Sequence, residues 1–305
     1  MPKAILKRSL FWARVAMNAA KGWSTHNAFQ HAAALAFYTL FSMAPILIIA
    51  VAVTGFVFGE KAAQGEIVSQ FGDIMGEESA GALETAIAQS SFDNTGYIST
   101  IMGLVLLAVG ATTVFGQLQL SLNQVWDVKV KPTRSGLLNL LKTRLLSLTL
   151  VLTIGFLLLV SLVLSTFVSA VIRFADDRIS IPPALLGSAD LVVSFLIITF
   201  LFAMIFKVLP DVKLQWSDVG RGAMTTAALF IAGKFLISFY LSHTGTASTY
   251  GAAGSLVAVL LWVYYSSLIL IYGAEFTRAY VEASGRTVEP KQIATRVQQR
   301  LIDSG

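Results

Sequence analysis

Long apolar segments, separated by polar connections, follow one another along this chain. The clearest covers residues 250–280, YGAAGSLVAVLLWVYYSSLILIYGAEFTRAY, in which Glu275 and Arg278 appear only near the end. A helix of about 20 residues, rising 1.5 Å per residue, crosses a hydrocarbon core of about 30 Å. We therefore predict an all-α, polytopic membrane protein with six transmembrane helices, over about residues 31–58, 97–126, 145–172, 185–208, 222–241 and 252–279.

Composition excludes an ordinary soluble domain and several kinds of chemistry. Hydrophobic residues make up 55% of the chain and charged residues 13%, with a mean hydropathy of +0.72, whereas soluble domains carry about 25% charged residues. Cysteine is absent, which excludes disulfides and thiol catalysis. The three histidines, His26, His31 and His243, are too few and too scattered for a zinc motif. We expect no metal and no cofactor.

Lysine and arginine are distributed unevenly among the connections. Residues 1–26, 127–144 and 207–221 and the tail from Arg278 carry five, five, three and five of them, whereas the alternate connections carry one, two and none. Because basic residues concentrate in cytoplasmic loops, we predict that both termini are cytoplasmic. The net charge of +5 then reflects topology and attraction to anionic membrane lipids, and it requires no nucleic-acid partner.

The chain divides into a basic N-terminal segment, residues 1–26, a six-helix transmembrane domain, residues 27–280, and a polar cytoplasmic tail, residues 281–305. At about 100° per residue, basic side chains gather on one side of an N-terminal helix: Lys3, Lys7, Arg14 and Lys21. Apolar side chains gather on the opposite side: Ile5, Trp12, Val15, Ala16 and Ala19. This segment either lies on the anionic membrane surface with its lysines among the headgroups, or is a positive flank that fixes topology.

The connection over residues 59–96 is acidic and is predicted to lie outside, on the side of the membrane opposite the cytoplasm. Its only basic residue is Lys61, and Ile67, Phe71 and Ile74 are spaced for one face of a helix. We predict one or two amphipathic helices packed over the outer mouth of the bundle, either as a lid or as a structural cover.

Polar residues follow one side of each of the first two predicted spans. In the first span they are His31, Tyr38 and Ser42, followed by Pro45, which cannot donate to the Phe41 carbonyl and predicts a kink. In the second span the stripe consists of Thr112, Gly116, Gln119 and Asn123. The first stripe should face other helices, as ordinary packing contacts or as part of a cavity. The second either lines an aqueous cavity or cross-links helices.

Lys234 is the most informative residue, because it lies past the midpoint of the fifth predicted span. A lysine at the centre of a span costs ~2.5–3.5 kcal/mol, so neighbours should compensate its charge. Candidate partners are Glu275, Asp190 and the amides of the second span; the alternative is a lysine that snorkels to the membrane surface. The predicted transport cavity therefore contains Lys234, Glu275, Gln119, Asn123, Thr112, Tyr38, Ser42 and Tyr264, with Pro45 as the kink that helps it open.

Four separated segments carry a family resemblance: AFYTLFSMAPIL (36–47), SLNQVWDV (121–128), LPDVKLQWSDVGRGA (209–223) and YGAAGS…LLWVYYS…YGAEF (250–276). In this order they resemble the YihY/BrkB family of bacterial inner-membrane proteins, which were once labelled ribonuclease BN. The resemblance implies six transmembrane helices, an inner-membrane location and transport-like roles, including movement of lipids or envelope precursors. It implies no catalytic residue.

Three functions are compatible with these residues. The first is a transporter or flippase of an anionic amphiphile, in which Lys234 attracts the charged head and Glu275 is its counter-ion or a proton acceptor. The second is a membrane scaffold whose basic face binds anionic lipid, an envelope partner protein or a second copy of the chain. The third, a ribonuclease, is disfavoured because the predicted cytoplasmic carboxylates are dispersed. We therefore predict a protein that is not an enzyme.

Overall fold

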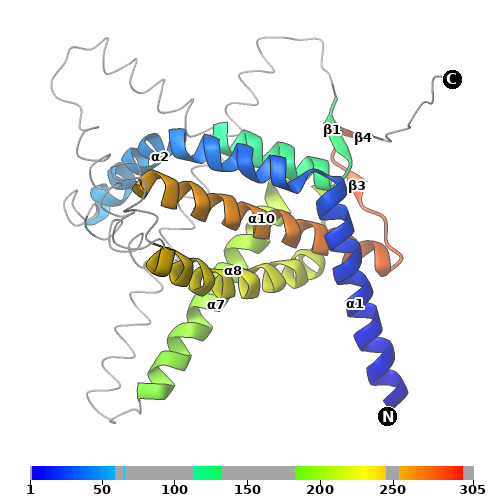
Figure 1. The fold of residues 1–305 in the computed structure, drawn as a ribbon. Coiled ribbons are helices and arrows are strands. Elements are labelled where there is room, and N and C mark those ends of the chain that lie inside the picture. The colour runs from blue at the N-terminus through cyan, green and yellow to red at the C-terminus, as the bar shows by residue number, and fades with distance from the viewer. Residues whose placement is uncertain (1, 59–64, 66–112, 132–182, 245–253, 298–305) are drawn as a thin grey trace.

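The computed structural model describes residues 2–58, 65, 113–131, 183–244 and 254–297, and most of these are helical, as predicted. The helices are α1 (Pro2–Thr25), α2 (Ala28–Phe58), α7 (Pro183–Val208), α8 (Trp216–Thr244) and α10 (Gly254–Ala283). Residues 113–125 form a further helix, green and unlabelled in Figure 1. The strands are β1 (Val128–Val130), β2 (Val212–Lys213), β3 (Glu289–Pro290) and β4 (Ala294–Arg296).

Helix α10 lies at the centre of the described bundle. It packs against α1, α2 and α8, and α7 packs against α8 (Figure 1). The largest fully buried side chains include Phe206, Leu122, Leu209 and Ile271, which come from three different segments of the chain. The core is therefore built around one face of α10 and the helices that cover it.

The contact between α8 and α10 is close because each helix places a glycine beneath a threonine of the other. A side chain at Gly222 would overlap Thr277, and a side chain at Gly273 would overlap Thr226. Each threonine hydroxyl donates to the carbonyl of the glycine in its own helix, at 2.7 Å for Thr226 and 2.8 Å for Thr277. The hydroxyls are thus satisfied internally, which suits a contact in an apolar environment.

Helix α1 runs crosswise to α2 and α10 in Figure 1 and packs its apolar side on α10. Val15 and Ala19 are fully buried against Phe276 and Ala279. Trp12 stacks on Phe276, with ring centroids 6.1 Å apart. The apolar side predicted for the N-terminal segment therefore contacts protein along this half of the helix.

The polar tail forms two short strand pairs with connections that come from elsewhere in the chain. β4 pairs antiparallel with β1, so that Val128 lies opposite Arg296, and β3 pairs antiparallel with β2, so that Val212 lies opposite Pro290. Strands of two or three residues are too short for a period-two hydrophobic pattern to show, and the sequence did not predict them. The tail thereby connects residues 127–131 to the turn between α7 and α8.

The described helices cover three of the six predicted spans entirely, a fourth apart from its first two residues, and a fifth in part. α2, α7, α8 and α10 cover the predictions over 31–58, 185–208, 222–241 and, apart from its first two residues, 252–279, and the helix over 113–125 lies within 97–126. The prediction over 145–172 and nearly all of the acidic connection 59–96 lie outside the described residues.

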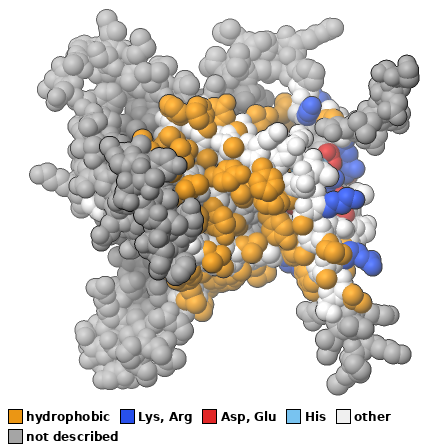
Figure 2. Space-filling view, viewed as in Figure 1, with side chains coloured by type: hydrophobic (Ala, Val, Ile, Leu, Met, Phe, Trp, Pro, Cys, Tyr) orange, Lys and Arg blue, Asp and Glu red, His pale blue; other side chains and the backbone are white. Residues whose placement is uncertain are grey.

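Two of the described helices are apolar enough, over a sufficient length, to cross a membrane: the segments are Leu191–Val208 in α7 and Leu256–Ala283 in α10. Large hydrophobic side chains are also exposed on several helices, among them Phe41 at 66%, Leu196 at 59% and Phe235 at 65%. Figure 2 shows hydrophobic side chains over the middle of the molecule and Lys and Arg toward the side where β1 and β4 lie. Such a broad apolar surface is typical of a protein that contacts lipid.

Candidate functional site

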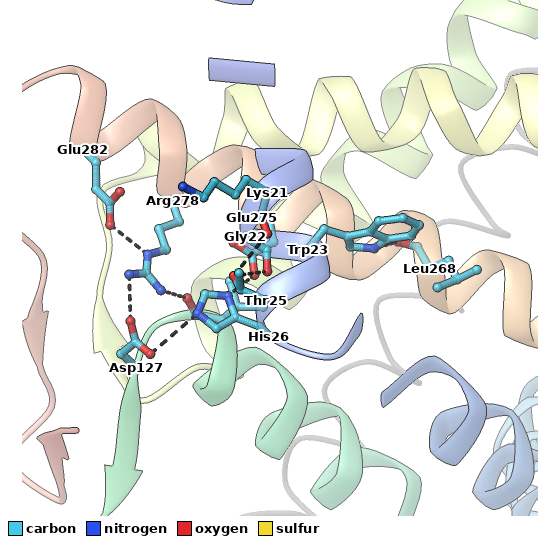
Figure 3. A network of polar contacts seen from close by, with 11 residues as sticks. Lys21, Gly22, Trp23, Thr25, His26, Asp127, Leu268, Glu275, Arg278 and Glu282 are labelled. Atoms are coloured by element: carbon cyan, nitrogen blue, oxygen red, sulfur yellow. Dashed lines mark hydrogen bonds and ion pairs between the residues drawn. The ribbon is translucent and has the colours of Figure 1, made fainter. Parts of the chain in front are cut away.

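A charged network joins α10 to the turn between α1 and α2 and to the end of the helix over 113–125 (Figure 3). Its buried member is Glu275, whose residue exposure is 2%. Nδ1 of His26 lies 2.6 Å from Oε1 of this carboxylate. Gly22, one turn before His26, leaves room for the same carboxylate, since a side chain there would overlap Oε2 of Glu275.

The hydrogen bond with Glu275 is the largest effect on His26 and raises the pKa of its imidazole above the ordinary 6.5. Burial and the charge of Arg278 act in the opposite direction, and Asp127 adds to the increase. The second ring nitrogen, Nε2, lies 3.7 Å from Oδ1 of Asp127. His26 therefore stands between a buried and a half-exposed carboxylate, an arrangement that suits a proton relay.

Arg278 completes the network. It pairs with Oδ2 of Asp127 at 2.7 Å and with Oε1 of Glu282 at 2.8 Å. Its Nη1 also donates to the carbonyl of Val125, at 2.5 Å. A cation at the C-terminal end of a helix bonds a carbonyl that has no partner within the helix, and it is attracted to the negative end of the helix dipole. Arg278 thus fastens the end of the helix over 113–125 to α10.

A second polar cluster surrounds Asp211, which is 2% exposed in the turn between α7 and β2. Its carboxylate accepts hydrogen bonds from Asn123 at 2.8 Å and from Gln119 at 3.1 and 3.3 Å, and its backbone amide donates to Oδ1 of Asn123 at 2.8 Å. Gln119 and Asn123, in the second predicted span, therefore link this helix to the turn between α7 and β2, which is the cross-linking alternative. Their membership of a transport cavity stays a prediction.

Lys234 lies in a small pocket between α8 and α10. The other lining residues are Phe230, Gly233, Trp262, Tyr265 and Ser266. Lys234 is half-buried, whereas the next two residues, Phe235 and Leu236, are 65% and 64% exposed. Within the part of the chain that the structure describes, no carboxylate pairs with Lys234, and the structure does not bring it into contact with Glu275.

The other predicted cavity residues have varied surroundings. Ser42 is buried at 2% exposure, Tyr38 is 37% exposed and Tyr264 packs partly buried against the core. His31, from the same predicted stripe as Ser42, lies with Nδ1 3.1 Å from Oγ of Ser121, which links α2 to the helix over 113–125. Pro45 lies within α2, while its side chain and the whole of Thr112 lie outside the described residues.

The residues predicted to face anionic lipid all lie on α1. Arg14 and Lys21 are exposed, and the side chains of Lys3 and Lys7 are outside the description. This surface stays a prediction. The candidate counter-ion Asp190 lies in α7, and its side chain is likewise not described.

Sequence reasoning missed five members of these clusters: His26, Asp127, Arg278, Glu282 and Asp211. A weak signal existed, because each lies at the end of a predicted span on the side assigned to the cytoplasm. Ends of neighbouring spans on one side of a membrane come together in a bundle, so charged residues there are candidates for pairing.

Comparisons with known proteins agree with the resemblance carried by the four segments. Residues 19–298 match the family described as Virulence factor BrkB. A UPF0761 membrane protein of Alkalilimnicola ehrlichii is 27% identical over 95% of this chain and 65% of its own length. A UPF0761 membrane protein of Pseudomonas paraeruginosa is 30% identical over 82% of this chain and 58% of its own length.

A Bacillus subtilis relative, named putative ribonuclease-like protein YfkH, is 25% identical over 83% of this chain and 90% of its own length. The chain thus spans less than two thirds of the two UPF0761 relatives and most of YfkH. No solved structure matches the chain. Because the family match covers most of the chain, this protein belongs to the BrkB family of membrane proteins, with relatives in bacteria.

Proposed function

We propose that the protein transports an anionic amphiphile, either a lipid or an envelope precursor, across the bacterial inner membrane. The observation that carries this proposal is the position of Lys234, in a pocket between α8 and α10 instead of on the exposed side of α8. Charged residues within membrane spans are costly and mark substrate pathways more often than structural sites. A lysine without a carboxylate partner among the described residues can accept the anion of a substrate.

The pocket is too small in this structure to hold an amphiphile, but its lining combines apolar and polar groups. Trp262 and Tyr265 provide aromatic surface next to the lysine, and Ser266 provides a hydroxyl. Ligand sites commonly combine apolar walls with a few polar groups that fix orientation. Glu275, His26 and Asp127 would form a proton relay at one end of the same bundle, so that substrate movement could be coupled to protonation.

We also propose six spans with both termini in the cytoplasm. This orientation is supported by the four basic regions that alternate with poorly charged connections. It is supported further by contacts at one end of the bundle, where the tail pairs with β1 and β2 and where Asp127 meets the turn after α1. Regions assigned to the same side of the membrane are thus in contact.

Reconstituted vesicles provide the test. Full-length protein in vesicles should move fluorescent phosphatidylglycerol between leaflets faster than fluorescent phosphatidylcholine, and Lys234→Met should reduce that rate at least tenfold. Lys234→Arg should retain part of it, because the charge remains. The matched control is Lys213→Met, which removes an exposed lysine from a connection. Unchanged movement in a folded Lys234→Met protein would contradict the proposal and favour a scaffold that binds anionic lipid or a partner.

A ribonuclease activity, suggested by the name of the Bacillus relative, is the remote alternative. Hydrolysis of a phosphodiester needs positioned metal-binding or acid–base groups in water. Among the described residues, no group of three His, Asp or Glu side chains could hold a metal ion. Purified protein incubated with RNA at several Mg²⁺ and Mn²⁺ concentrations should leave the RNA intact; cleavage that co-elutes with the protein and disappears in a point variant would support the enzyme.

A further inference from the structure

An open groove lies between α1 and α8, on a different side of α8 from the Lys234 pocket. It has a volume of ≈ 350 Å³ and is lined by Trp12, Arg221, Met224, Thr225 and Phe276. At about 100° per residue, Arg221 and Thr225 stand on the side of α8 opposite Phe230. The groove is therefore independent of the proposed transport pocket.

The inner wall of the groove is aromatic. Trp12 stacks nearly parallel on both Phe276 and Tyr280 of α10, with centroid distances of 6.1 and 5.7 Å. Among the described residues, no acceptor bonds the indole N–H of Trp12. A buried or half-buried indole commonly finds such a partner, so this donor is free to bond a ligand.

Arg221 lies at the rim of the groove, and its charge has no carboxylate partner in the described parts of the chain. Its guanidinium carbon is 4.5 Å from the centroid of the Tyr280 ring, and its Nη1 donates to the Tyr280 hydroxyl and to the Ser217 carbonyl. No carboxylate of the described chain pairs with it, whereas the nearby Asp218 is already paired with Arg286. The remaining N–H groups of Arg221 form a fork that matches the geometry of a phosphate.

An exposed apolar stripe continues from Arg221 along α8. Met224, Ala228, Ala232 and Phe235 recur three or four residues apart, and all four are exposed. Arg221 thus lies near the N-terminal end of α8, close to the strand pair that β2 forms with β3. The apolar stripe extends from Arg221 toward the C-terminal end of α8. This polarity is that of a membrane phospholipid, with its headgroup at the surface and its acyl chains directed inward.

We propose that this groove is a specific site for an acidic glycerophospholipid. The headgroup phosphate binds Arg221 and the indole N–H of Trp12, and an acyl chain lies on Met224 and the stripe that follows it. A net negative headgroup is favoured over a zwitterionic one, because Arg221 has no counter-ion among the residues that the structure describes and an ammonium group would oppose it. The bound lipid would fill the space between α1 and α8.

Native mass spectrometry of the full-length, delipidated protein tests this site by titration with phosphatidylglycerol. We expect Arg221→Gln to weaken the tightest binding event about tenfold, as for loss of a charge-assisted bond. Lys213→Gln removes one positive charge from an exposed position outside the groove and should change the affinity less than about twofold. Equal losses in the two variants would overturn the proposal, because they would indicate diffuse attraction to the basic surface.

Three further measurements test the groove and distinguish binding of the whole lipid from binding of its headgroup alone. Thr225→Phe fills the groove without changing charge and should also abolish the tightest event while leaving the thermal unfolding midpoint unchanged. Phosphatidylglycerol with brominated acyl chains should quench Trp12, measured as the difference between wild type and Trp12→Phe. If inorganic phosphate competes with phosphatidylglycerol at similar concentrations, or if Trp12 is not quenched, the site does not bind the acyl part and the proposal fails.

Discussion

Glu275 shows how a single carboxylate can be retained in an apolar helix. It is buried on α10, and its carboxylate meets His26 from a turn 249 residues away in sequence. Gly22 makes this contact sterically feasible, since a larger residue would occupy the same space. The cation that meets Glu275 is titratable near neutral pH, so the contact between α1 and α10 depends on protonation.

The raised pKa of His26 fixes the sign of that dependence. The pKa of His26 is higher in the folded protein than in the unfolded chain, where it is about 6.5. The protonated imidazole therefore stabilises the fold fully at a pH below the unfolded-state pKa. This contribution is lost as the pH rises through the folded-state pKa. We expect His26→Gln to cost about 1.5–3 kcal/mol on the acid side of pH 6.5. The cost should shrink steadily in more alkaline buffer.

Unfolding free energies from SDS titrations in mixed micelles, repeated across pH, measure this difference. His31→Gln is the control, because His31 contacts Ser121 and, among the described residues, pairs with no carboxylate. A His26→Gln cost that stays constant or grows as the pH rises would contradict the predicted role.

Individual site residues were predictable only in part. Lys234 and Glu275 are conspicuous in the sequence, because each is an ionisable group in an apolar run. The partner of Glu275 was not predictable, since neither periodicity nor local spacing relates residue 26 to residue 275. The network could be recognised only once α1 was seen to cross α10.

At the scale of elements, amide hydrogen bonds add to the hydrophobic packing between the helix over 113–125 and the α7–β2 turn. Asn123 both donates to the Asp211 carboxylate and accepts from the Asp211 backbone amide. We expect Asn123→Ala to leave both groups without this partner and to cost about 3 kcal/mol. The same mixed-micelle titration measures the loss.

Gln124→Ala is the matched control for this cross-link. Gln124 is the next residue of the same helix, and no side-chain bond to Asp211 involves it among the described contacts. Its replacement should change stability by less than about 0.5 kcal/mol. Similar costs for the two variants would show that the amide cross-link is unimportant.

The reciprocal glycine–threonine contact makes a second prediction at this scale. Gly222→Ala should destabilise the protein by about 1–3 kcal/mol, because the new methyl group overlaps Thr277. Thr277→Ala, combined with Gly222→Ala, should recover part of the loss and give a coupling energy above about 0.5 kcal/mol.

Gly220→Ala is the control for this contact, since a methyl group there meets nothing within 4 Å. In a helix it should be neutral or stabilise by up to about 1 kcal/mol. Additive effects of Gly222→Ala and Thr277→Ala would indicate that α8 and α10 adjust without the interlocking contact.

Elements were far more predictable than their contacts. Runs of about 20 apolar residues identify helices because the length of a span is fixed by the bilayer, and α2, α7, α8 and α10 lie where such runs occur. The strands β1–β4 gave no signal, because two or three residues carry too little pattern. Their pairing is set by the positions of the helices to which they are attached.

For the whole molecule, the proposed orientation makes a direct prediction. The chain contains no cysteine, so single cysteines can be labelled without background. A membrane-impermeant maleimide should label Glu78→Cys in intact cells, because the acidic connection is predicted to be periplasmic. It should label Lys213→Cys and Thr287→Cys, both at exposed positions, only after the cells are opened. Labelling of all three in intact cells would contradict the orientation.

The strand pairs of the tail have a consequence for biosynthesis. Residues 289–296 leave the ribosome after all of α1, α2, α7, α8 and α10, so β1 and β2 have no strand partner while those helices are being inserted. A nascent chain that stalls before this point would expose two free backbone edges and an unpaired Asp218. Synthesis of residues 289–296 therefore closes both edges, and quality-control proteases could distinguish chains truncated before these residues by the open edges.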